Sequence, residues 1–338
     1  MYYAKYGNRG CLFELRVNDI LITEMTKSTN IGEALITVNP AIFKSGKQTI
    51  EVHLSPIKGE EVISNKKPFR LEIGYYDSTE EVDESGEATW HTVFTLPDIE
   101  IPEKGLPYID MKGEFEANVP YQYTYWDDCV DLRTIPDIEQ KIVKEYEYVR
   151  KLIAQKDLEQ LKKYFIPSYQ EFAITIYQTK EEIESDWMET CKLINKHSTS
   201  DLQPIEEYRI VFSSNGRSVS LRSNKYNGYP SALIFIKEID NGARLRYGYI
   251  ELHLGMKKGT DKLIVKISDY IFQDEEKIQK GIGDAMGGKV LELEIGKVKS
   301  GRGSTWQGDW RIYWRSAWQG NWRIYWQSNW RSQRRRTP

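Results

Sequence analysis

The sequence predicts a multi-domain protein in which an all-β antiparallel sandwich precedes an α+β domain. Three observations lead to this prediction. Residues 12–120 contain strand-like segments with no helical period between them. Residues 138–194 then contain segments whose apolar positions recur at three-and-four spacing, and strand-like segments return after Pro204. A chain of 338 residues is long enough for two or three such units.

The first expected domain covers residues 1–125 and consists of segments that alternate apolar and polar residues or are rich in β-branched and aromatic ones. Turn-forming residues such as Asn18-Asp19 and Ser45-Gly46 separate these segments. Because no helix is expected between the strands, they should pair antiparallel. The expected strands are LFELRVNDILIT (12–23), ALITVNPAIF (34–43), QTIEVHLSPI (48–57), FRLEIGYYD (69–77), TWHTVFTLP (89–97) and GEFEANV (113–119).

Helices are expected at the start of the second domain, which covers residues 126–272. Pro136 suits the first turn of a helix, Asp157 should begin a second, short helix, and Thr179 with Glu182 fits a capping box that opens a third. Each helix would bury one apolar stripe. The stripes are Ile138, Ile142, Val143, Tyr146, Val149, Leu152 and Ile153; Leu158, Leu161, Tyr164 and Phe165; and Ile183, Trp187, Cys191 and Ile194.

Strands complete the second domain. Asn215-Gly216, Asn241-Gly242 and Lys258-Gly259 are turn signals, and Asn-Gly is favoured in two-residue hairpin turns. Helices followed by an antiparallel meander predict an α+β arrangement with the helices on one face of the sheet. The expected strands are EYRIVFSS (207–214), RSVSLRS (217–223), SALIFIKEI (231–239), RLRYGYIELHL (244–254) and KLIVKIS (262–268).

No residue pattern predicts a catalytic, cofactor-binding or metal site. GIGDAMGGKV (281–290) matches a phosphate-binding loop except at its last position, where Val290 replaces the Ser or Thr that ligates magnesium. We interpret it as a glycine-rich connector within residues 273–300, between a helix-like segment, DEEKIQK, and a strand-like one, VLELEI. The four histidines have no metal-ligand spacing, and no G-x-S-x-G is present. A Ser/His/Asp set could only be assembled by the fold.

Charge is distributed unevenly along the chain. The net charge is −3, but residues 301–338 hold eight Arg, one Asp and neither Lys nor Glu, which gives +7 and leaves −10 for the other 300 residues. An acidic body favours the capture of cationic surfaces. Asp127, Asp128 and Asp131, which follow Trp126 at the domain junction, are candidates for such a surface, although a solvated loop would have the same composition.

A tryptophan repeat fills the C-terminal segment, residues 301–338. On a strand, a spacing of four places every Trp on one face, and Gln319-Gly320-Asn321 could close a hairpin that pairs the indoles as a ladder. Alternatives are a nucleic-acid or glycan surface, since Arg and aromatic residues interleave, and a foreign appended segment. We expect a ladder that docks on the body or on a partner chain. The repeated residues are Trp306, Trp310, Trp314, Trp318, Trp322, Trp326 and Trp330.

The expected compartment is the cytoplasm. The start, MYYAKYGNRGCLFELRV, lacks a basic region followed by an apolar run, so no signal peptide is expected, although removal of a leader would place the protein in the periplasm. Cys11, Cys129 and Cys191 are an odd number, widely spaced, and are interpreted as buried free thiols in a reducing compartment. No transmembrane helix is expected.

A resemblance adds a functional expectation. The segments RVNDILI (16–22), TVNPAIFKSGKQTIEVHLSPI (37–57) and WDDCVDL (126–132) occur in an order similar to that of uncharacterised two-domain proteins of Bacteroidetes-type bacteria. Some of those resemble immunity proteins encoded beside type VI secretion effectors. The resemblance implies a non-enzymatic protein that neutralises a toxin by binding it, and it supplies no catalytic residue.

Two other functions compete with that expectation. One is nucleic-acid or glycan binding through the C-terminal segment, and the other is an enzyme with a pocket in the α+β domain. The second domain also resembles NTF2-like domains in element order, a fold that hosts enzymes and binding modules alike.

Overall fold

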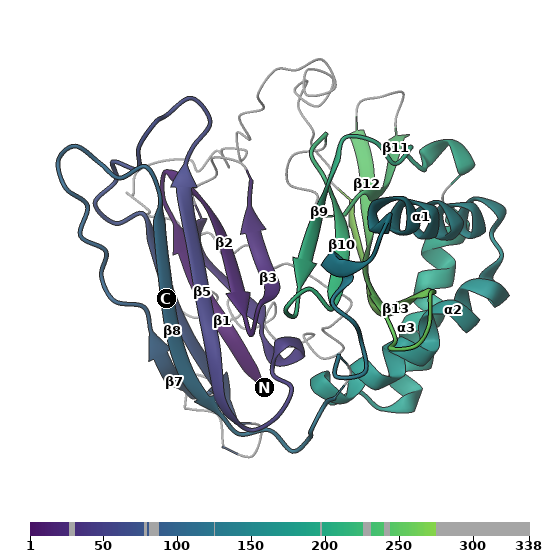
Figure 1. Ribbon diagram of the computed structural model, residues 1–338, viewed down its shortest axis with the longest axis horizontal. Coiled ribbons are helices and arrows are strands. Elements are labelled where there is room, and N and C mark those ends of the chain that lie inside the picture. Colours follow the sequence, from purple (N-terminus) through teal and green to yellow (C-terminus); the bar gives the residue numbers. More distant parts are fainter. Residues whose placement is uncertain are drawn as a thin grey trace, which may run out of the picture.

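The computed structural model describes residues 1–26, 31–77, 80, 88–124, 126–196, 198–225, 231–239 and 244–274. Within these residues the chain forms three antiparallel sheets and three α-helices (Figure 1). Two sheets make the N-terminal half, and the third sheet, with all three helices, makes the remainder. The prediction of a fold rich in antiparallel β-sheet with three helices is therefore confirmed, and the arrangement is compatible with the predicted division into more than one domain. None of the described helices combines the length and apolarity needed to span a bilayer.

The N-terminal half is a sandwich of two four-stranded sheets, in the orders β4-β1-β6-β7 and β3-β2-β5-β8. Alternate residues point into one apolar core, as in β2, where Cys11, Phe13, Leu15 and Val17 are buried and the residues between them are not. The strands are β1 (Tyr2–Asn8), β2 (Cys11–Val17), β3 (Ile20–Met25), β4 (Ile31–Thr37), β5 (Gly46–Pro56), β6 (Phe69–Tyr76), β7 (Trp90–Thr95) and β8 (Ile109–Ala117).

Strand β1 was not expected from the sequence. It lies between β4 and β6, and its residues are buried on both faces except at Lys5. A strand that is covered on both faces does not need a polar residue at every second position, so the sequence lacks the apolar–polar alternation that predicts a strand.

The expected strand over residues 34–43 ends early, because β4 stops at Thr37 and a short 3-10 helix, η1 (Asn39–Ala41), follows. Pro40 stands in the first turn of η1, where the missing N–H costs nothing. The Asn39 side chain is buried, accepts a hydrogen bond from the Tyr2 amide at 2.6 Å and donates one to the Thr175 carbonyl at 2.8 Å. An amide that joins three segments in this way explains why the chain leaves the strand here.

The three expected helices are confirmed as α1 (Ile138–Gln155), α2 (Leu158–Ala173) and α3 (Lys180–Lys196). The Thr179 amide donates to Glu182 at 2.8 Å and the Glu182 amide donates to the Thr179 hydroxyl at 3.2 Å, which is the predicted capping box. Helix α2 is longer than expected because it continues through Pro167. Its buried residues Tyr169, Phe172 and Ala173 pack in a second apolar cluster that holds this last part of the helix in place.

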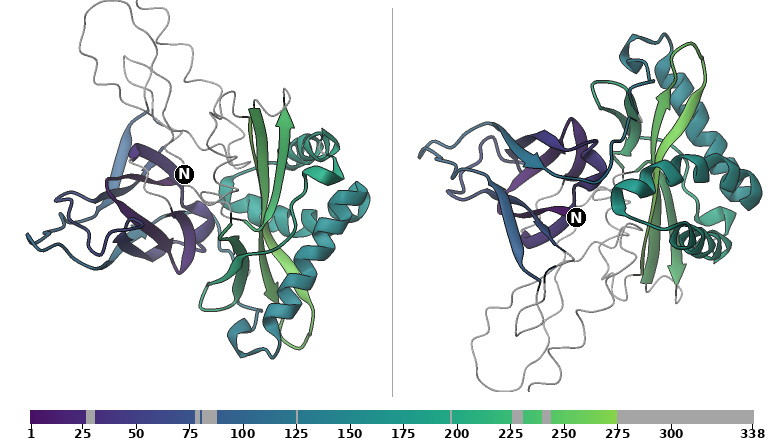
Figure 2. Two further views of the ribbon diagram at one scale, coloured as in Figure 1. Left: turned by 90° about the horizontal axis from the view of Figure 1, so that it is seen from above. Right: turned by 90° about the horizontal axis from the view of Figure 1, so that it is seen from below.

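The third sheet has the order β11-β12-β10-β9, with β13 on the other side of β12. The helices cover one face of this sheet and the other face is turned toward the sandwich (Figure 2). Asn215 and Gly216 have φ of 55° and 80° and form the predicted hairpin turn, closed by a 3.1 Å bond from the Arg217 amide to the Ser214 carbonyl. The strands are β9 (Tyr208–Ser213), β10 (Ser218–Ser223), β11 (Leu233–Ile239), β12 (Arg244–Met256) and β13 (Leu263–Asp274).

A side chain from α1 enters the third sheet between β10 and β12. These strands share a single register pair, Val219 with Leu254. Two positions further along, the Tyr146 hydroxyl accepts a hydrogen bond from the Leu221 amide at 2.9 Å and donates one to the Leu252 carbonyl at 2.8 Å. The hydroxyl thus replaces the backbone pairing where the strands separate.

Candidate partner-binding surface and contacts between the domains

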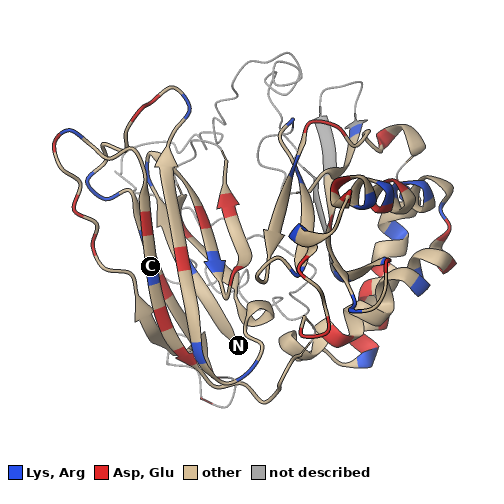
Figure 3. Ribbon diagram, viewed as in Figure 1, with Lys and Arg blue, Asp and Glu red and all other residues tan. Residues whose placement is uncertain are grey.

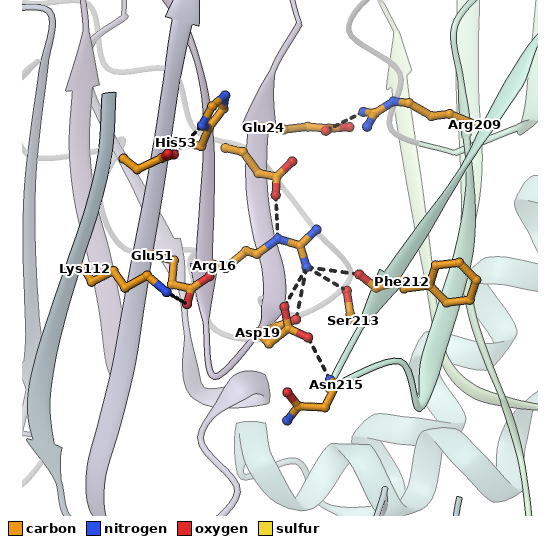
Figure 4. A network of polar contacts seen from close by, with 12 residues as sticks. Arg16, Asp19, Glu24, Glu51, His53, Lys112, Arg209, Phe212, Ser213 and Asn215 are labelled. Carbon is orange, nitrogen blue, oxygen red and sulfur yellow. Dashed lines mark hydrogen bonds and ion pairs between the residues drawn. The ribbon is translucent and has the colours of Figure 1, made fainter. Parts of the chain in front are cut away.

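Arg16 of β2 joins the sandwich to the second domain (Figure 4). Its guanidinium donates to the Phe212 carbonyl at 3.1 Å and to the Ser213 hydroxyl at 3.4 Å, both on β9. The carboxylate of Asp19, which lies 3.3 Å from Arg16, accepts from the Asn215 amide at 2.7 Å. The β2–β3 turn and the β9–β10 turn therefore hold each other through charge-assisted hydrogen bonds.

Two further contacts extend this interface. Glu24 of β3 pairs with Arg209 of β9 at 2.5 Å (Figure 4). In addition, the Asn39 amide donates to the Thr175 carbonyl of the second domain, and an apolar cluster built on α2 packs against Met1, Phe43 and Tyr121. Polar and apolar contacts together fix the orientation of the two domains.

Replacing Arg16 with alanine is expected to lower the free energy of unfolding by about 1–3 kcal/mol, because the Phe212 carbonyl and the Asp19 carboxylate lose a partly buried donor. Urea titration followed by circular dichroism measures the change. Arg16→Lys is the matched control: it keeps the charge but not the forked geometry, so it should recover only part of the loss. An Arg16→Ala protein as stable as the wild type would contradict the role given to this contact.

The junction residues predicted to bind a partner are largely engaged within the chain. Trp126 is 2% exposed, and the Nζ of Lys266 lies 5.9 Å from its ring centroid. The Asp128 carboxylate lies 3.4 Å from Lys257 and 3.5 Å from the buried Lys266. Partial burial alone would raise the pKa of Asp128, but the two ammonium groups lower it below its ordinary value. Asp128 therefore stays ionised and fixes the linker to the third sheet.

Asp131 has a similar structural role. Its side chain caps the 3-10 helix η2 (Leu132–Thr134) and forms a two-pronged ion pair with Arg133, with contacts of 2.8 and 2.6 Å. A Cβ on Gly216 would come within 2.1 Å of the Asp131 carboxylate, so the β9–β10 turn fits closely over it. Asp127 differs, since its side chain is 72% exposed and Arg217 is 4.0 Å away. Of the four junction residues, Asp127 is the one most open to a partner.

A buried polar cluster occupies the face of the third sheet that is turned toward the sandwich. Arg222 of β10 contacts Glu251 of β12 at 2.6 Å, and the same carboxylate accepts from His253 Nε2 at 2.8 Å. The other ring nitrogen of His253 lies 3.4 Å from the Ser218 hydroxyl. Burial would raise the pKa of Glu251, but Arg222 and His253 lower it to about 2.

This cluster is the Ser/His/carboxylate set that the sequence could not show. Ser218 has no exposed surface and His253 is 6% exposed. A nucleophile needs access to its substrate, so in this arrangement the three side chains form an interior hydrogen-bond network. Its residues alternate with buried apolar ones on β10 and β12, and that alternation was the available sequence signal.

The outer face of β5 and β8 carries a row of exposed ion pairs, which we name the outer ladder. Figure 3 shows charged residues spaced along both strands. Three cross-strand pairs span it: His53 with Asp110 at 2.5 Å, Glu51 with Lys112 at 3.0 Å and Lys47 with Glu114 at 2.8 Å. Glu116 extends the row opposite Lys47. Tyr108, which is 58% exposed, stacks on His53 at its end. Four carboxylates thus face two lysines.

Several predicted features fall outside the described residues. They are the phosphate-loop-like segment 281–290, the connector 273–300 from residue 275 onward, and the partner-binding tryptophans Trp310, Trp314, Trp318, Trp322 and Trp326. Within the described ranges, no three His, Cys, Asp or Glu side chains are grouped to hold a metal ion. The cysteines are free, and burial raises the pKa of the Cys11 and Cys129 thiols to about 11.

Comparisons with family models, with curated proteins and with solved structures found no match to this chain. The resemblance to immunity proteins therefore stays a prediction.

Proposed function

We propose that this protein acts by binding another protein and that the outer ladder is its contact surface for a cationic partner. The observation that supports this is an exposed sheet face with an excess of carboxylates and an exposed tyrosine at one end. Tyrosine supplies large contact area with little loss of conformational freedom, and it is enriched at interface centres. The carboxylates attract a basic surface before contact.

The fold supplies a rigid base for this surface. The outer ladder lies on paired strands whose inner residues pack in the sandwich core, as Ile50, Val52 and Phe115 do. Ion pairs across the strands also hold the charged side chains in place, which reduces the entropy that binding must remove.

The most specific form of the proposal is an immunity protein that neutralises a bacterial toxin by covering a basic surface on it. The charge of −10 on residues 1–300 and the resemblance of roughly residues 10–270 to such proteins support this form. Toxin surfaces that engage nucleic acid or membranes are basic, so an acidic binder would compete for them. An immunity protein of this kind would lie in the compartment where the toxin has its target, which is either the cytoplasm or the periplasm.

Two alternatives remain as competing proposals. Nucleic-acid or glycan binding through residues 301–338 predicts that truncation at 300 abolishes affinity for single-stranded RNA and DNA. An enzyme in the NTF2-like second domain would use the Ser218, His253 and Glu251 set, and Ser218→Ala would then abolish its activity. Because Ser218 is fully buried, we favour protein binding.

Charge reversal on the outer ladder is expected to weaken partner capture. Co-expression of this chain with the product of the adjacent gene should yield a complex, and Glu114→Lys with Glu116→Lys should slow its association by about tenfold or more at low salt. Surface plasmon resonance at two ionic strengths measures the rate. Glu171→Lys with Glu181→Lys, a charge change of equal size on the helices, should have little effect.

The proposal fails if no neighbouring product is recovered and if deletion of this gene leaves cells no more sensitive to competition from sibling cells. An unchanged association rate for the outer-ladder variant would show that a partner exists but binds elsewhere.

A further inference from the structure

Strand β8 is the terminal strand of its sheet. In the part of the chain that the structure describes, β8 pairs with β5 and with no other strand. It lies on the side of the sandwich away from the second domain (Figure 1). An unpaired edge of nine residues leaves backbone N–H and C=O groups able to accept another strand.

The two faces of β8 set requirements for such a strand. On the inner side, Ile109 and Met111 are only partly buried, so apolar surface remains at the edge. On the outer side, Asp110, Glu114 and Glu116 present carboxylates. A complementary strand would alternate large apolar residues with basic ones.

The C-terminal segment of this chain has that alternation. In the run WRIYWR (310–315), one set of alternate residues is Trp310, Ile312 and Trp314, and the other is Arg311, Tyr313 and Arg315. The next repeat, WRIYWQ (322–327), keeps this alternation, with Gln327 in the place of Arg315. Residues 301–338 carry +7, opposite in sign to the body.

The length of the chain permits the contact. Thirty-four residues, 275–308, lie between Asp274, the end of β13, and Asp309. Extended, they span about 115 Å, whereas a compact chain of this size has a diameter of roughly 50 Å.

We propose that the tryptophan and arginine repeat of residues 309–331 adds as a strand to the open edge of β8, with its arginines beside the carboxylates of the outer ladder. This contact deepens the proposed function, because the arginines of the repeat would compete with a cationic partner for the carboxylates of the outer ladder. That regulatory consequence rests on the proposed function, whereas the docking itself does not.

Hydrogen exchange of the full chain tests the docking without any partner. Amides of β8 that point away from β5 exchange rapidly if the edge is open and slowly if a strand covers it. We expect exchange over residues 109–117 to become at least about tenfold faster in a variant with Arg311, Arg315, Arg323 and Arg331 changed to Gln. Glu114→Lys with Glu116→Lys should have the same effect.

Matched controls separate docking from unfolding. Glu171→Lys with Glu181→Lys should leave β8 exchange unchanged, and β2 amides, which pair on both sides, should stay slow in every variant. Equal β8 exchange in wild type and both variants would overturn the inference. Protection that rises with protein concentration would also overturn it, since a second copy would then be the occupant. Partner capture is measured separately, so either proposal can fail alone.

Discussion

Replacing Glu251 with glutamine is expected to lower the free energy of unfolding by about 3–5 kcal/mol. Glu251 is the anion shared by Arg222 and His253, and Arg222 is 3% exposed. Loss of the carboxylate leaves a buried guanidinium without its counter-charge, which costs more than the pair itself contributes. Urea unfolding at pH 7 measures the change. Glu51→Gln, which breaks an exposed pair in the outer ladder, should leave stability almost unchanged.

The pH dependence of stability gives a second readout for the same side chain. The pKa of Glu251 falls from 4.5 to about 2 on folding. A depressed carboxyl pKa stabilises the fold above the unfolded value, and that contribution is lost as pH falls from about 4.5 toward about 2. The difference in stability between wild type and Glu251→Gln should therefore shrink over this window. A difference that stays constant down to pH 2 would show that Glu251 is not the titrating group.

Elements with a clear period could be predicted from the sequence. The three helices have apolar stripes at three-and-four spacing, and most strands alternate, so local pattern and tertiary burial agree. Strand β1 has no alternation because both of its faces are covered. Helix α2 continues past Pro167, although a proline inside a helix usually ends it. The helix continues because its last turns are buried.

The residues of the described sites come together through contacts between segments that are far apart in the chain. A single sequence does not reveal such contacts. Trp126 follows an aromatic run and precedes acidic residues, a composition typical of a surface, yet the fold buries its ring. Arg222, Glu251 and His253 meet because β10 and β12 share a face. The sequence shows polar residues at alternate positions on each strand. That these residues share one face follows only from the order of the strands in the sheet.

Replacing Tyr146 with phenylalanine is expected to lower the free energy of unfolding by about 2–4 kcal/mol, although the substitution removes only one oxygen atom. The Tyr146 hydroxyl is fully buried and satisfies both the Leu221 amide and the Leu252 carbonyl. Without it, two backbone groups lose their partner in an apolar interior, and each costs about 1–3 kcal/mol.

Two measurements check this prediction. Urea unfolding gives the loss of stability, and hydrogen exchange should show the Leu221 amide opening faster than its neighbours on β10. Tyr148→Phe is the matched control, since Tyr148 lies two residues along the same helix and is 42% exposed. Equal stability of the two variants would mean that water or a shift of β10 replaces the hydroxyl. A larger loss for Tyr146→Phe would show that α1 supplies a hydrogen bond on which the third sheet depends.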